Sequence, residues 1–230
     1  MFDPDFIFIN EEFDAEHVSP QELDSLLALG WRHFGTYFYR YNLGLYEFDI
    51  RRVIPLRIRL ADFSPSKSQR RTLAKNDDLN IRIEPITITE ESQRLFDLHK
   101  TRFRSGAPES IFDFLSGSPA NVPVEAMQIV VCENDDPIAI SYFDLGEEAI
   151  SGVYATFDPA FSSRRLGIFT LLKEIEFAIA QGKEYYYLGY SYSGSSFYDY
   201  KKKFRASESF DWQTRGWEPY LTIEEADATA

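Results

Sequence analysis

Cysteine is almost absent from this sequence, which has a single one, Cys132, in 230 residues. One cysteine excludes an internal disulfide and any metal site built from clustered cysteines. Cys132 lies in the apolar run MQIVVCEN, which predicts a buried strand and an unreactive thiol in the core.

Long hydrophobic runs are also missing. No apolar run approaches the roughly 20 residues that a membrane-spanning helix needs. The first residues, MFDPDFIFINEEFD, have no basic segment ahead of an apolar one and predict no secretion signal. A hydrophobic content of 44% is typical of a folded protein. We therefore expect a cytoplasmic protein with no membrane partner.

Positive charge is scarce and unevenly placed. The formal net charge is -13, yet residues 51–75 hold eight basic side chains against one acid, Asp62, and residues 201–205 hold four more. A mostly negative body repels nucleic acid, so a polyanion must meet a focused basic patch. This favours a defined phosphate contact over binding along DNA. The alternative is that these cations pair with the surplus carboxylates as a solvated surface.

Hydrophobic periodicity predicts an ordered series of elements from residue 79 onward. Alternation with a period of two marks strands, and apolar residues at helical spacing mark helices. Residues 162–182 are the strongest helix prediction, because Ile168, Leu172 and Ile175 share one face and Gly182 ends it. The predicted order is a strand (79–86), two helices (89–103, 109–117), three strands (126–134, 137–145, 149–158), the long helix, a strand (184–192), a short helix (195–204) and a last strand (208–215).

This order of elements in residues 79–230 resembles the Gcn5-related N-acyltransferase fold. The fold class that it implies is α+β, with a mixed, mostly antiparallel sheet flanked by helices. In that fold the fourth strand, the long helix and the fifth strand surround the place where an activated acyl group meets an amine. Residues 1–78 are predicted to be an N-terminal α+β extension that carries the basic segment. Fold alone does not fix the chemistry.

The start of the long helix decides which acyl donor fits. Enzymes of this fold that use coenzyme A bind its pyrophosphate on backbone amides there, with the pattern R-x-x-G-x-G/A. The corresponding residues are Arg164-Arg165-Leu166-Gly167-Ile168-Phe169, and Phe169 stands where a small residue is wanted. We therefore expect no coenzyme A. The plainer interpretation is that these residues only begin a helix.

Three separated blocks of sequence identify a different donor. They are FSPSKSQRRTLAKNDDL, YATFDPAFSSRRLGIF and YLGYSYSGSSFYDYKKKF, which occupy 63–79, 154–169 and 187–204. Together they resemble the aminoacyl-tRNA protein transferases, the arginyl- and leucyl-transferases that modify protein N-termini. The resemblance extends from about Leu26 to Phe204. It implies an aminoacyl-tRNA donor, no other cofactor, and an amine acceptor such as a protein terminus that begins with Asp or Glu.

Two departures from that family affect the prediction. The family has clustered cysteines, reported to bind metal or an iron-sulfur cluster, in a segment that corresponds here to YRYNLGLYEFDIRRVIPLRI, where none is present. Ser195 also stands where the family has a cysteine. Because of the first departure, we predict no metal site in this chain. The acceptor also stays open, because the segment without cysteines belongs to the N-terminal extension. A specialised relative that aminoacylates a small molecule or another amine is an alternative.

The resemblance assigns roles to individual residues. Aminoacyl-tRNA is an activated ester, and its attack by an amine needs the amine held unprotonated against the carbonyl. We expect Asp158 or strand carbonyls to accept the proton, and Tyr190 or Tyr198 to protonate the leaving ribose oxygen. For Asp158, which precedes a proline, a turn is the plainer role. The residues predicted to contact aminoacyl-tRNA are Ser66, Ser68, Arg70, Arg71, Arg164, Arg165, Lys201 and Lys203, and those predicted for the acceptor are Arg40, Arg57 and Tyr187.

The leading hypothesis is therefore transfer of an amino acid, arginine or leucine, from tRNA to an amine. One rival from the enzyme class is an acyl-coenzyme A N-acyltransferase. A rival from another class is a tRNA-binding module without catalytic activity, which the missing cysteines make plausible.

Overall fold

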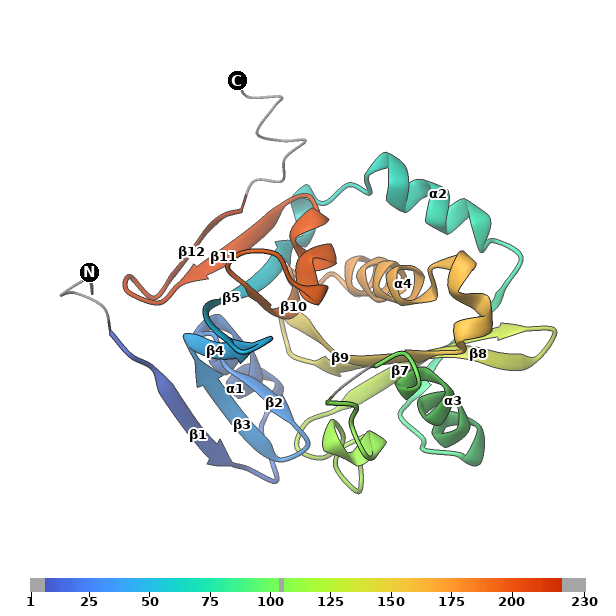
Figure 1. The fold of residues 1–230 in the computed structure, drawn as a ribbon, viewed down its shortest axis with the longest axis horizontal. Coiled ribbons are helices and arrows are strands. Elements are labelled where there is room, and N and C mark those ends of the chain that lie inside the picture. The colour runs from blue at the N-terminus through green and yellow to red at the C-terminus, as the bar shows by residue number, and fades with distance from the viewer. Residues whose placement is uncertain (1–6, 104–105, 221–230) are drawn as a thin grey trace.

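The computed structural model describes residues 7–103 and 106–220. Within these ranges, one nine-stranded sheet has the order β12-β11-β5-β10-β9-β8-β7-β6, with β4 paired to β5 (Figure 1). Its strand pairs are antiparallel except for β9 with β10, which is parallel. The strands are β4 (Leu43–Tyr46), β5 (Asp49–Arg59), β6 (Asn80–Pro85), β7 (Ala126–Glu133), β8 (Asp136–Leu145), β9 (Ala149–Phe157), β10 (Tyr185–Tyr192), β11 (Ser207–Asp211) and β12 (Gly216–Pro219).

Helices cover both faces of this sheet. Figure 1 shows α4 (Leu166–Ala180) on one face and α3 (Glu90–Lys100) on the other, with α2 (Lys67–Lys75) outside α4. Alternate residues of β7 point to opposite sides, so Val131 packs in the core under α4 and Cys132 in the core under α3. The predicted fold class and the buried, strand-borne Cys132 are confirmed.

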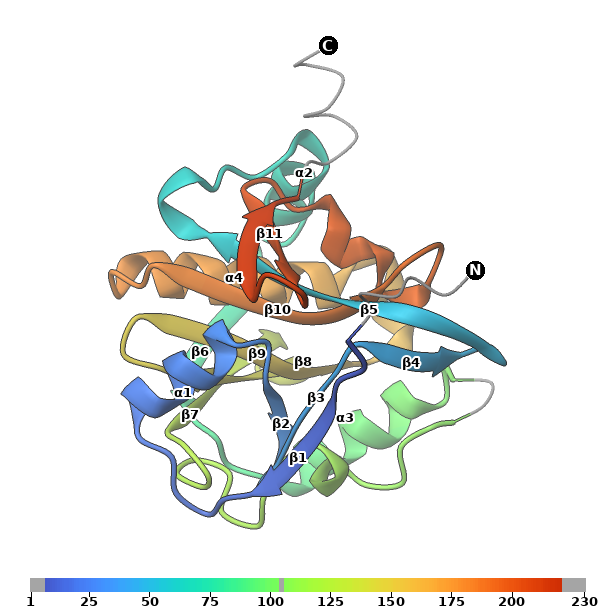
Figure 2. The ribbon, with the colours of Figure 1, turned by 90° about the vertical axis from the view of Figure 1, so that its left-hand side faces the viewer.

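A second layer precedes the main sheet in the chain. It contains α1 (Pro20–Ala28) and a three-stranded sheet of β1 (Asn10–Asp14), β3 (Tyr37–Tyr41) and β2 (Arg32–Phe34), in that order. Ser19 and Glu22 form a capping box that begins α1. Leu23, Leu27 and Phe38 pack with Tyr187 of β10, so this layer rests on the main sheet beside the parallel strand pair. Figure 2 shows it on the opposite side of β10 from α4.

The strand β5 connects the two parts of the chain. Although it belongs to the first 78 residues, it pairs with β10 on one side and with β11 on the other. Ile58, for example, is the register partner of both Tyr186 and Ser207. The division of the chain at residue 78 stays a prediction. The structure adds that the earlier segment supplies a central strand to the sheet of the later one.

Local geometry differs from the sequence analysis in several places. The long helix begins only at Leu166, because Arg165 has a left-handed backbone (φ 57°) that separates it from the 3-10 helix η3 (Pro159–Arg164). The predicted helices at 109–117 and 195–204 are 3-10 segments, η2 (Ile111–Asp113) and η4 (Phe197–Lys203). Their side-chain caps, Ser110 and Ser196, begin one turn in η2 and about two turns in η4, and neither segment continues as an α-helix.

Residues 67–75 of the basic segment were assigned no element from the sequence, and they form α2. Ser66 and Gln69 cap its start reciprocally. None of the helices in the described residues is long and apolar enough to cross a membrane.

Candidate active site and nucleic-acid interface

The parallel strands β9 and β10 part near the middle of the sheet. They pair only from Ala149–Ser151 to Tyr185–Tyr187. β10 then bulges where it pairs with β5, and Gly189 at the bulge has a left-handed backbone (φ 81°) that favours glycine. Beyond this point the edge of β9 continues toward η3 without β10 beside it.

Arg32 fills the first part of this opening. It extends from β2 and is only 7% exposed. Its guanidinium donates to the Ser151 hydroxyl and to the Gly152 carbonyl, each at 2.5 Å. A side chain from the N-terminal layer thus donates a hydrogen bond to β9 at the point where β10 no longer pairs with it. Nothing in the pattern WRHF identified Arg32 from sequence.

Lys201 enters the same region from η4. Its ammonium donates to the Tyr190 carbonyl at 3.0 Å. Burial, and then the positive charge of Arg32, lower the pKa of Lys201 to about 7. A Cβ placed on Gly189 would lie 3.2 Å from Lys201 Nζ and 3.5 Å from Arg32 Cζ, so both cations lie above this glycine. Within the described residues, neither forms an ion pair with a carboxylate.

Five tyrosines that contact one another, here called the tyrosine cluster, lie beside the two cations. Tyr190 donates to the Gly30 carbonyl at 2.6 Å and packs edge-on against its neighbours from β3. Tyr198 is 37% exposed, and its ring centre lies 5.2 Å from Lys201 Nζ. Burial raises the pKa of most of these phenols, so they stay protonated at neutral pH and can donate hydrogen bonds. The tyrosine cluster consists of Tyr39, Tyr41, Tyr190, Tyr192 and Tyr198.

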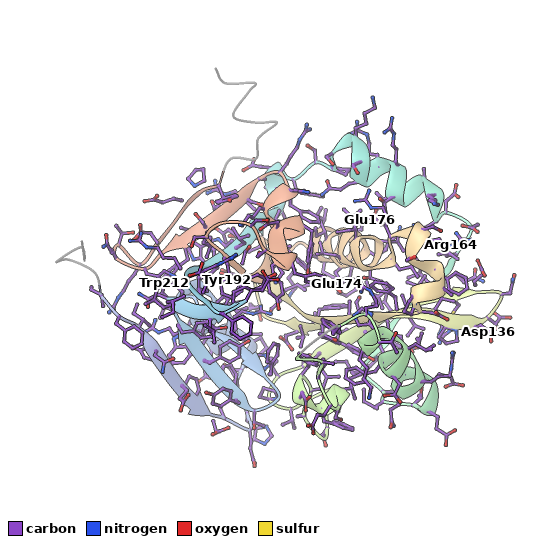
Figure 3. The ribbon with its side chains drawn as sticks, in the orientation of Figure 1. Asp136, Arg164, Glu174, Glu176, Tyr192 and Trp212 are labelled. Carbon is purple, nitrogen blue, oxygen red and sulfur yellow. The ribbon has the colours of Figure 1, made fainter. Side chains whose placement is uncertain are left out.

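A buried acid lies behind the opening. Glu174 of α4 accepts a hydrogen bond from Tyr186 and is 3% exposed. Burial raises the pKa of Glu174 to about 8, so the carboxyl is mostly protonated at neutral pH. Gly152 lies against this pair, and a Cβ there would overlap the Tyr186 hydroxyl. Figure 3 shows Glu174 in α4 between Tyr192 and Arg164.

The first two sequence blocks meet at the N-terminus of α4. Arg165 donates to the Ser68 hydroxyl at 2.8 Å, and Lys75 donates to the Ser163 carbonyl at 2.8 Å. Asn76 closes the contact by donating to the Arg164 carbonyl at 2.9 Å. The basic segment and the Arg-Arg pair are therefore side by side.

The predicted tRNA-binding residues differ in how free their charges are. Arg164 makes a two-pronged ion pair with Asp78, 2.9 Å for each bond, and reaches Glu133 at 2.8 Å, so its charge is matched within the protein. Arg70, whose guanidinium touches only the Pro65 carbonyl, and Arg71 are exposed on α2. Ser66 is committed to capping α2. Lys203 and Arg165 are exposed, whereas Lys201 points inward.

The remaining predicted residues do not meet at the opening. Asp158 caps η3 by accepting from the Ala160 amide, and it lies six residues, or about 20 Å, along β9 from Gly152. Arg40 pairs with Glu11 on β1.

Two further predicted residues are part of the sheet core. Arg57 is buried against Glu208 at 2.7 Å and stacks on Tyr185 and Trp217. Its second bond goes to the hydroxyl of Tyr187, which is itself buried. The roles assigned to these residues, and to Asp158 and Arg40, stay predictions.

Phe169 does not lie where the sequence analysis expected. Its side chain is 1% exposed and packs in the core between α4 and the sheet. It cannot crowd a phosphate at the helix start, so the steric argument against coenzyme A loses its basis.

Comparison with known proteins gives concordant matches. Residues 7–71 match the family described as arginine-tRNA-protein transferase, N terminus, and residues 91–211 match its C terminus. An aspartate/glutamate leucyltransferase of Stenotrophomonas maltophilia (strain R551-3) is 32% identical over 195 residues, which are 80% of this chain and 76% of that protein. Another aspartate/glutamate leucyltransferase, from Pseudoalteromonas atlantica, is 28% identical over 86% of this chain and 83% of its own length.

Among solved structures, FemX superposes with a TM-score of 0.53 at 11% sequence identity. The match covers 96% of this chain and 74% of FemX. At this identity the likeness concerns the fold alone.

Proposed function

The chain belongs to the arginine-tRNA-protein transferase family, and from this premise we propose that it transfers leucine from leucyl-tRNA to proteins that begin with Asp or Glu. Leucine and the acidic acceptors follow the names of its relatives. The charged tRNA is the only donor, with no coenzyme A, and the reaction takes place in the cytoplasm. The observation that carries the proposal is the opening between β9 and β10, entered by two cations and edged by the tyrosine cluster.

The donor approaches from the face formed by α2 and the start of α4. Arg70, Arg71, Arg165 and Lys203 contribute exposed positive charge to an otherwise anionic chain. Guanidinium groups bind phosphate oxygens in pairs, and such contacts position an RNA without reading its sequence. The free edge of β9 leads from this face toward the tyrosine cluster, which provides a path for the aminoacylated 3′ end.

The acceptor amine attacks the ester carbonyl within the opening. A bond forms between the amine nitrogen and the carbonyl carbon, the bond to the ribose oxygen breaks, and the proton that the amine nitrogen loses balances the one that the ribose oxygen takes. A tyrosine that gives its hydroxyl proton to the ribose oxygen receives the proton of the amine in exchange. Tyr198 suits the role of proton donor, because its phenol is protonated and partly exposed, whereas Tyr190 is already bonded to Gly30. Orientation supplies most of the acceleration, on the order of 7 to 11 kcal/mol for well-aligned reactants.

The test is transfer of labelled amino acids from charged tRNA to peptides. Leucyl-tRNA and arginyl-tRNA are each incubated with the protein and with peptides that begin with Asp, Glu or Ala. We expect leucine to become attached to the Asp and Glu peptides in a form that resists mild base, which cleaves the tRNA ester. Absence of transfer from either tRNA to all three peptides would contradict the proposal.

A further inference from the structure

The two cations at the parted strands lack a counterion. Each lies within 3.5 Å of the position of a Cβ on Gly189, so Lys201 Nζ and Arg32 Cζ are less than about 7 Å apart. Their hydrogen-bond partners are neutral, namely a hydroxyl and two carbonyls. Buried charges are normally paired, since an unpaired one is costly to remove from water. Two like charges side by side raise that cost further. Burial and the neighbouring charge are why the pKa of Lys201 falls to about 7, and an anion bound between the two groups would favour its protonated form.

Three acids on the elements around the opening already have partners. Glu174 is protonated at neutral pH and bonded to Tyr186. Asp144 pairs with His33 at 3.0 Å, and Asp199 pairs with Lys202 at 2.8 Å. Within the described residues, the protein therefore supplies no free carboxylate to this site, and an anion from outside would complete it.

We propose that Arg32 and Lys201 together bind the side-chain carboxylate of the acceptor's first residue and so select Asp and Glu. This inference rests on the proposed function. The carboxylate of an N-terminal Asp is separated from its α-amine by two carbons, and that of Glu by three. One residue can therefore place its carboxylate between the cations while its amine lies at the edge of β9, where transfer occurs.

The surroundings favour a carboxylate over an RNA phosphate. A phosphodiester carries a sugar on each side, whereas Arg32 is only 7% exposed and lies near Tyr39 and Tyr190. The ring of Tyr198 is 37% exposed and its centre lies 5.2 Å from Lys201 Nζ, so it is the partly exposed neighbour that an entering side chain would meet beside Lys201. The cations suited to phosphates are the exposed ones on α2.

The discriminating experiment compares acidic acceptors with their amides. Wild type, Lys201→Met and the control Lys100→Met are assayed for kcat/KM with peptides that begin with Asp or Asn. Lys100 is a half-buried lysine of α3 that pairs with Asp97. We expect wild type and Lys100→Met to prefer Asp by about 100-fold or more, because an unmatched buried pair of charges rejects a neutral amide. In Lys201→Met the value for Asp falls at least 30-fold while that for Asn changes little. Lys201→Arg restores part of the preference.

Binding measurements separate this inference from the proposed function. Calorimetry with the same peptides and no tRNA needs no turnover, and we expect wild type but not Lys201→Met to bind the Asp peptide more tightly than the Asn peptide. If wild type binds this way yet transfers nothing, the carboxylate site stands and the proposed function fails. An unchanged preference for Asp in Lys201→Met overturns the site. So does a loss of affinity for uncharged tRNA equal to the loss of transfer, because the anion would then be a phosphate.

Discussion

The cations of α2 and the two cations at the parted strands carry the same charge in opposite surroundings. Arg70 and Arg71 extend into solvent, where water and salt screen them. Arg32 is buried and Lys201 is half-buried, and the hydrogen bonds of both go to neutral acceptors. An exposed charge attracts any phosphate nearby at little structural cost. A buried pair accepts only a group of the right size and charge, so the two regions suit holding a donor and choosing an acceptor.

Arg164 represents a third arrangement between these two. It is matched by two carboxylates and ties the end of α2 to η3 and β7. Its charge stabilises the fold, because these ion pairs hold α2, and with it the exposed Arg70 and Arg71, against the start of α4. A basic residue in a sequence block that resembles the family can therefore stabilise the fold without contacting the tRNA.

The largest effect on stability is expected from overpacking the core at the point where β9 and β10 part. In Gly152→Ala the new methyl group overlaps the Tyr186 hydroxyl, which is held by Glu174 in a packed core. Overpacking of this kind costs about 2 to 3 kcal/mol, or roughly 5 to 10 °C in Tm. Thermal unfolding measures it. Gly117→Ala is the control, since nothing lies within 4 Å of a Cβ there, and equal losses in both variants would refute the close contact.

A smaller effect is expected from the buried acid behind the opening. The unfolded chain releases the Glu174 proton near pH 4.5, whereas the native state keeps it until about pH 8. The native state therefore binds the extra proton between these values, and this contribution to stability is lost as pH rises from 4.5 to 8. Glu174→Gln removes that loss, which is on the order of 1 kcal/mol per pH unit, or about 3 °C in Tm.

The measurement for Glu174 is Tm at pH 5, 6 and 7 for both proteins. In this range Lys201 holds its proton in both states over most of the interval, and His99 contributes equally to the two proteins. The difference in Tm between Glu174→Gln and wild type should grow with pH. A constant difference would mean that Glu174 titrates normally.

The smallest effect is expected for the exposed cations of α2, and it concerns the affinity for tRNA. Replacing Arg70 and Arg71 by Ala should weaken tRNA binding about 10-fold near 0.1 M salt and reduce the slope of log K against log salt by one to two. Filter binding over a salt series measures both. The control replaces Arg94 and Lys100 of α3 by Ala. Identical losses in the two variants would remove the distinction between α2 and the rest of the surface.

Local patterns predicted the elements that depend on neighbouring residues. Strands β7 to β9 were predicted as short apolar runs, because each contributes residues to the core under α3 and to the core under α4. The edge strand β6 was predicted from its alternation. The start of α4 was placed too early, since the left-handed Arg165 is set by contacts with α2 and leaves no periodic signal. The position of β5 between β10 and β11 is a pairing over more than 100 residues, which periodicity does not report.

The site was predicted in outline but not in its charged centre. The opening between the strands follows from the fold, and Tyr190 and Tyr198 lie at it. Arg32 was missed because its role arises from a layer folded back on the sheet. Glu174 left one signal. It stands four residues from Thr170 and from Ala178 on one stripe of α4, and all three are buried.

The central position of β5 also orders events during synthesis. Its partners in β10 and β11 are made more than 120 residues after it, so β5 leaves the ribosome long before either can pair with it. Until then only the first residues of β5 have a strand partner, β4, and the apolar side chains of the rest stay exposed. Long-range strand pairing of this kind is slow. The same arrangement suggests an experiment with two fragments, divided in the loop between α2 and β6. The N-terminal fragment would then supply β5 to the sheet of the C-terminal fragment.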